Sequence, residues 1–256
     1  MNHFSDHRSK IGGHRGSAAA DLNADAGGRW TLLAACAVTL VLWFVPYGEF
    51  VLYPLRLLGT FLHEGGHALA TLLTGGFVRG IAIQPDGSGV TLSGGGLRLA
   101  VLPAGYLGAT VYGALLLLLV RRGWDGRRLL FVTGTVIGLL TFFTLPQANL
   151  FGFMCGALIT GALVAAGRFL TPRAAAWTAA FLGVQCALNA LWDLRTLLYL
   201  SLGIATPSSG GQTDAAQMAG LTLIPAPVWA FLWMALSFAL LWIVLGGPVP
   251  RRTRAR

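Results

Sequence analysis

Long apolar segments are the feature that most constrains the fold of this chain. They lie at roughly 30–46, 50–74, 97–120, 128–145, 149–170, 174–200 and 224–246. Each is close to the length of roughly 20 residues with which an α-helix crosses a bilayer. Charged residues make up only 11% of the chain, about half the fraction of a typical soluble domain. The sequence therefore predicts an all-α polytopic membrane protein, a bundle of about seven transmembrane helices.

The polar segments divide the chain around this bundle. Residues 1–28 are rich in His, Ser, Gly, Asp and Arg without periodicity, and we expect a disordered polar tail there. Residues 29–247 form the expected transmembrane domain, residues 201–223 form a polar loop within it, and residues 248–256 form a basic tail. This division predicts a single membrane-embedded domain with two polar tails.

The net charge of +9 comes almost entirely from arginine in short loops and tails, such as 121–128 and 251–256. This distribution is typical of the basic loops of membrane proteins. We therefore expect the lipid bilayer, and not nucleic acid, as the surrounding partner, and the sequence does not indicate an oligomeric state. Three cysteines lie in apolar segments without C-x-x-C spacing, which favours buried thiols over a disulfide framework.

One motif lies inside an apolar segment, His63-Glu64-Gly65-Gly66-His67. It has the pattern H-E-x-x-H, which places both imidazoles on one face of a helix, where they can bind one zinc ion. The chain has only two Glu and five His, so chance would produce the pattern in about one such sequence in a thousand. Glu64 between the ligands can act as a general base. The motif predicts a catalytic zinc site inside the membrane domain.

A catalytic zinc usually has three protein ligands, so a third His or acidic residue is needed. Glu49 stands near the end of a span, and Asp193 lies within an otherwise apolar segment. We expect the remaining acidic residues in the tail or in turns and loops: Asp6, Asp21, Asp25, Asp86, Asp125 and Asp214. Asp193 is therefore the predicted third ligand. The alternative, an ion pair with Arg195, is weakened because residues two apart on a helix do not face each other.

Gln185, Asn189 and Asp193 are spaced by four residues and form one polar stripe on a predicted helix. Asn189 would lie one turn from the predicted ligand. Its amide could donate to a developing oxyanion, or it could make a helix-to-helix hydrogen bond, and the sequence leaves both roles open. Gln185 and Asn149 are further candidates for binding substrate or the oxyanion. Asn149 also has the position of a helix start after Pro146.

Residues 76–96 differ from the apolar segments around them. Residues 77–83 and 90–93 are strand-like, and Gln84 to Gly89 have strong turn chemistry. We expect a β-hairpin directly after the motif helix. It is either a surface loop or a strand edge that pairs with an extended substrate segment through main-chain hydrogen bonds.

Glycines recur on the motif segment and the next one: Gly59, Gly66, Gly105, Gly108 and Gly113. We interpret them as positions where membrane helices approach closely.

Together these residues resemble the site-2 protease-like intramembrane zinc metallopeptidases, and most closely the compact bacterial branch without a PDZ insertion. The resemblance rests on four stretches, namely Phe61–Ala70, Thr74–Thr91, Ala104–Ala109 and the late apolar segment with Asn189 and Asp193. It implies that His63, His67 and Asp193 bind Zn²⁺ and that Glu64 is the general base. It also implies a multi-pass protein of the bacterial cell membrane.

We therefore expect a zinc-dependent endopeptidase that hydrolyses peptide bonds of membrane-embedded proteins or peptides. Two alternatives need the same charges, namely an inactive membrane protein that binds zinc as a scaffold, and a proton or metal transporter. The orientation is open. The basic segments 121–128 and 168–173 share one side with the carboxyl-terminal arginines, and this side is predicted to be cytoplasmic. Seven spans then place the basic amino-terminal tail, with Arg8, Lys10, Arg15 and Arg29, on the other side. The resemblance instead places the hairpin on the cytoplasmic side.

Overall fold

The computed structural model describes residues 34, 36–39, 41–42, 45–205 and 212–246. The helix that carries the motif is α2 (Gly48–Leu73). Among the described residues, five helical segments are long and apolar enough to cross a membrane: α3 (Arg98–Arg121), α4 (Gly126–Phe142) with the 3₁₀ turn η1 (Leu145–Gln147), α5 (Leu150–Phe169), α6 (Pro172–Ser201) and α8 (Ala226–Gly246). The expected span 30–46 lies partly outside the described residues. The predicted all-α membrane bundle is confirmed. The expected tails, 1–28 and 248–256, lie outside the described residues.

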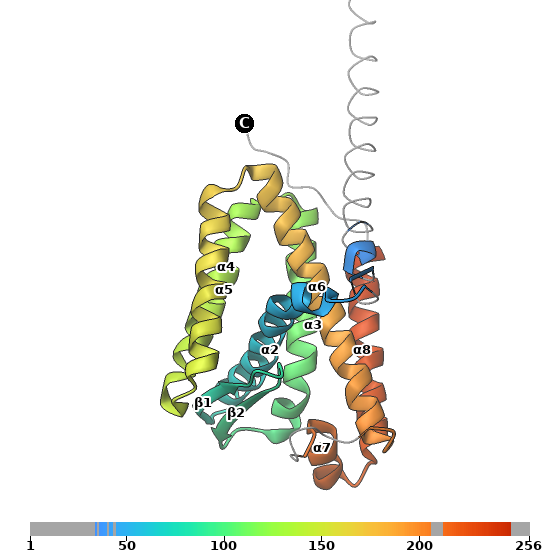
Figure 1. The fold of residues 1–256 in the computed structure, drawn as a ribbon. Coiled ribbons are helices and arrows are strands. Elements are labelled where there is room, and N and C mark those ends of the chain that lie inside the picture. The colour runs from blue at the N-terminus through green and yellow to red at the C-terminus, as the bar shows by residue number, and fades with distance from the viewer. Residues whose placement is uncertain (1–33, 35, 40, 43–44, 206–211, 247–256) are drawn as a thin grey trace, which may run out of the picture.

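Two ends of the bundle differ in what they carry (Figure 1). The hairpin and the short helix α7 (Asp214–Thr222) lie at one end, which we call the hairpin end. The α3–α4 and α5–α6 connections lie at the opposite end, which we call the arginine end. Helix α2 runs down to the hairpin between the α4–α5 pair and the group of α3, α6 and α8. The motif therefore lies in the half of the bundle next to the hairpin.

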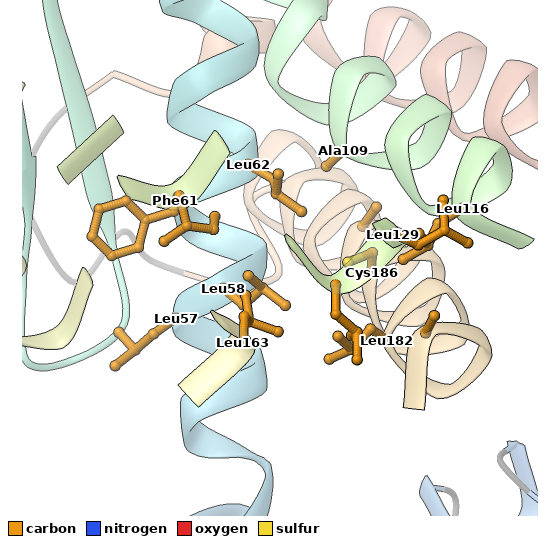
Figure 2. Packing of buried hydrophobic residues seen from close by; sticks show 14 of the residues in the cluster. Leu57, Leu58, Phe61, Leu62, Ala109, Leu116, Leu129, Leu163, Leu182 and Cys186 are labelled. Atoms are coloured by element: carbon orange, nitrogen blue, oxygen red, sulfur yellow. The ribbon is translucent and has the colours of Figure 1, made fainter. Parts of the chain in front are cut away.

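Apolar side chains on α2 anchor this helix in the core (Figure 2). Leu57, Leu58, Phe61 and Leu62 are buried, and they belong to a cluster that includes residues of α3, α4, α5 and α6. In a membrane bundle such packing stabilises through van der Waals contact between closely fitting side chains. The motif residues follow this buried stretch directly, so the packing fixes which face of α2 they present.

The predicted hairpin is confirmed, with antiparallel strands β1 (Phe77–Ile83) and β2 (Gly89–Gly94). Its turn is tied to α2, because the Thr60 hydroxyl donates to the Gly87 carbonyl at 2.8 Å and the Tyr53 hydroxyl donates to the Pro85 carbonyl. Ile81 and Ile83 are fully buried in the main core. The hairpin is therefore packed against the motif helix and is not a detached surface loop.

The segment 201–223, expected as a polar loop, contains the helix α7. Thr213 caps it, with its side chain accepting from the Ala216 amide, as hydroxyl residues do at helix starts. Ala215 and Met218 are buried in a second apolar cluster with residues of α3, α6 and α8. This packing stabilises a short helix that the polar composition of the segment does not indicate.

Candidate metal centre

The two motif histidines meet on one face of α2, as predicted. Their Nε2 atoms are 3.0 Å apart. The Nδ1 of His67 lies 2.8 Å from the Val101 carbonyl oxygen of α3, and a carbonyl can only accept, so Nδ1 is the donor. In the neutral imidazole, which is the metal-binding form, that bond places the lone pair of His67 on Nε2, the nitrogen that faces His63. A donor contact of this kind is the usual support of a metal-binding imidazole.

The third group beside the histidines is Asp214, the first residue of α7. Its Oδ2 lies 3.4 Å from Nε2 of His67 and 3.8 Å from Nε2 of His63. One ligand atom from each of these three residues lies within 4.8 Å of the others. Two imidazole nitrogens and one carboxylate oxygen form a usual ligand set for catalytic zinc. The donor chemistry of this cluster therefore fits a zinc ion.

Electrostatics favours the anionic form of Asp214. Burial opposes its ionisation, but the polar contacts and charges of His63 and His67 outweigh burial and hold the pKa of this carboxyl well below its usual range. The side chains of all three residues are only 10–19% exposed. Asp214 is thus a negatively charged group in a largely enclosed position, as a cation site requires.

Gly105 of α3 leaves space beside the two nitrogens. A Cβ atom at this position would lie 2.5 Å from Nε2 of both His63 and His67. Zinc binds imidazole nitrogens at about 2.0–2.1 Å, so a methyl group here would compete with an ion for the same volume. The absence of a side chain at Gly105 is a second observation, independent of the ligand chemistry, that fits a metal.

Glu64 points toward β2. The residue is buried, and its Oε2 accepts a hydrogen bond of 2.6 Å from the Thr91 hydroxyl. A Cβ atom on Gly89 would lie 2.7 Å from Oε1. The carboxylate therefore lies between the histidines' helix and the second strand of the hairpin, one residue from His63.

Asp193, the predicted third ligand, is not part of the three-residue cluster. It lies on α6, where its charge interacts with that of His63. In this structure Asp214 takes the position that the sequence assigned to Asp193, because α7 folds back onto the bundle. The ligand role of Asp193 stays a prediction, and Asp214 is the residue that the geometry favours.

The match to known families agrees with this arrangement. Residues 32–244 match the family described as Peptidase M50B-like. The chain belongs to the Peptidase M50B-like family. With its apolar helices, this membership makes it an integral, multi-pass membrane protein of a peptidase family, as the resemblance in the sequence implied. No curated protein and no solved structure matches the chain.

In this M50B-like chain the amides predicted to bind substrate make structural contacts. The Asn189 Nδ2 donates to the Leu55 carbonyl of α2 at 2.9 Å, so the helix-to-helix bond is the role that the structure shows. Asn149 caps α5 and accepts from the Ile83 amide, which ties β1 to that helix. Gln185 donates to Thr39. None of these three amides contacts the histidine cluster within the described part of the chain.

Four residues of the centre were not singled out for it from the sequence: Asp214, Gly105, Thr91 and Tyr106. Tyr106 packs edge-on against His63, with ring centroids 4.5 Å apart. A signal for Asp214 was available, because Thr213-Asp214 followed by Ala-Ala-Gln-Met has the pattern of a helix start. The other three depend on contacts between elements and have no local signature.

Proposed function

We propose that this chain is a zinc-dependent intramembrane endopeptidase that hydrolyses peptide bonds of membrane-embedded proteins or peptides. The observation that carries the proposal is the convergence of His63, His67 and Asp214 next to Glu64, inside a membrane bundle of a peptidase family. The cluster supplies three ligands, and Glu64 supplies a carboxylate that is not part of the ligand set. These are the components of a metallopeptidase site.

Each residue then has a defined role. His63, His67 and Asp214 would hold the ion, and Gly105 leaves it room. Zinc bound there would supply a Lewis acid that polarises the scissile carbonyl. Glu64 takes the proton from the attacking water and passes it to the leaving amine. The partly enclosed site limits the water that reaches the reacting groups.

The outer edge of β2 supports binding of an extended substrate segment, because no main-chain hydrogen bond to that edge is present in the described part of the chain. The Ile81 amide donates to the Phe143 carbonyl at 2.7 Å and the Ile83 amide to Asn149, so both point away from β2. Their cross-strand partners are Thr91 and Gly89. In an antiparallel pair such partners both point outward, so the amides and carbonyls of Gly89 and Thr91 face the outer edge of β2. These groups are available to add a strand beside Glu64.

The pairing assigns the substrate edge to β2. The amides of Ile81 and Ile83 on β1 already donate to Phe143 and Asn149. Cross-linking tests this assignment. Val90 is half exposed, and a Val90→Cys chain is combined with a substrate that carries single cysteines along its cleaved segment. We expect disulfide cross-links at alternate substrate positions, because side chains on a strand alternate. A repeat of three to four residues would indicate a helical substrate and contradict edge pairing.

The decisive experiment compares the only two glutamates of the chain. Glu64→Gln should abolish cleavage of a tagged single-span membrane substrate that the wild type cleaves, with bound zinc unchanged. Glu49→Gln is the matched control, because Glu49 is exposed in the first turn of α2 and should leave turnover unchanged. Wild-type turnover in Glu64→Gln would refute the mechanism. Metal-dependent ion transport by the wild type, or zinc binding without any cleavage, would favour the transporter or the scaffold instead.

A further inference from the structure

Thr91 makes the only hydrogen bond to the Glu64 side chain within the described residues. Its hydroxyl lies 2.6 Å from Oε2 of Glu64 and 2.9 Å from the Glu64 backbone carbonyl oxygen. A distance of 2.6 Å is typical of an O–H···O⁻ bond to a carboxylate. Because the donor lies on β2 and not on α2, the bond fixes the position of the carboxylate relative to the hairpin.

Gly89 confines the other side of the same carboxylate. A Cβ there would lie 2.7 Å from Oε1 and 2.8 Å from Cγ of Glu64. Strand β2 therefore contacts Glu64 at both oxygens, through a donor at Thr91 and through close backbone approach at Gly89. The same two residues present their main-chain groups at the outer edge of the strand.

We infer that Thr91 is a positioning residue that fixes the orientation of Glu64 relative to a peptide bound along β2. The inference rests on the proposed function, because the orientation of Glu64 matters only if Glu64 moves a proton. One strand then holds both the base and the substrate segment, so the distance between them is set by two neighbouring residues of β2. A hydroxyl at position 91 is the group that this role requires.

The test is Thr91→Val, which removes the hydroxyl and keeps the branched shape. We expect kcat to fall about 10- to 100-fold with KM changed less than about threefold, since a bond to a charged group is lost. Zinc content should be unchanged, and Thr91→Ser should restore kcat to within about threefold of wild type, because it restores the donor. A merely structural role would not separate kcat from KM or respond to serine.

Thr60→Val is the matched control, since Thr60 ties the same hairpin to α2 through Gly87 without a hydrogen bond to Glu64. Wild-type kcat in Thr91→Val, or an equal loss in Thr60→Val, would overturn the inference. Loss of activity in Glu64→Gln together with full activity in Thr91→Val would remove only the role of Thr91. Full activity in Glu64→Gln would instead refute the proposed function.

Discussion

Gly105→Ala tests whether zinc binding needs the space beside the two histidines, without changing any ligand atom. The substitution changes no donor atom and adds a single methyl group to α3. In the structure that methyl carbon would lie 2.5 Å from Nε2 of His63 and from Nε2 of His67, much closer than any ordinary contact. Either the histidines move apart or the methyl occupies the position between them.

The magnitude follows from the same distances. Zinc would bind imidazole nitrogens at about 2.0–2.1 Å, and a methyl carbon 2.5 Å from both Nε2 atoms would take up much of the space beside them. Displacing one ligand or tilting its ring weakens metal affinity at least as much as loss of a supporting contact, which costs about 10- to 100-fold. We expect zinc affinity to fall about 100-fold or more.

The assay measures zinc content after dialysis against a series of chelators of increasing zinc affinity. Thermal unfolding in detergent checks that the variant is folded. Gly108→Ala, one turn further along α3, is the control. Its added Cβ would meet only the Gly66 Cα at 3.3 Å, so zinc binding should stay near wild type. A folded Gly105→Ala chain with wild-type zinc affinity would refute the placement of the ion between the two imidazoles.

Three further outcomes follow from the structure. Asp214→Ala should lose the bound zinc in a folded protein, whereas Asp193→Ala should keep it, as measured by metal analysis; the reverse pattern would return the ligand role to Asp193. Ile81→Pro should loosen the hairpin by removing its bond to the Phe143 carbonyl, and limited proteolysis at the hairpin should accelerate; an unchanged digest would contradict that anchoring. Phe61→Ala should lower the free energy of unfolding by about 3 kcal/mol, because a fully buried ring leaves a cavity in the core; a loss below about 1 kcal/mol in equilibrium unfolding would contradict this packing.

Local patterns were sufficient for the parts of the molecule that are held within one element. Apolar length predicted the membrane-crossing helices α3, α4, α5, α6 and α8, and turn chemistry predicted the hairpin of β1 and β2. The i, i+4 spacing placed His63 and His67 on one face of α2. Each of these depends on neighbours a few residues away, where helix and strand geometry is fixed by the backbone. The family assignment rests on the same local motifs.

The third candidate ligand, by contrast, could be identified only from distances between residues far apart in the chain. Asp193 was favoured because it lies in an apolar segment, while Asp214 was assigned to a loop. The helix α7, docked by Ala215 and Met218, brings Asp214 to the histidines. The polar segment around Asp214 has no periodic pattern that would predict a docked helix. The apolar segment around Asp193 predicts that this residue is buried, but it does not show which residues Asp193 faces.

The sequence by itself determined a membrane bundle and two imidazoles on one helix face, because those follow from hydrophobicity and from 3.6 residues per turn. Only the tertiary structure decided that Gly105 leaves space beside the two imidazoles, that Thr91 bonds to Glu64, and that Asn189 bonds to Leu55. Those contacts join elements 27 or more residues apart in the chain, and their distances depend on how the helices and the hairpin pack.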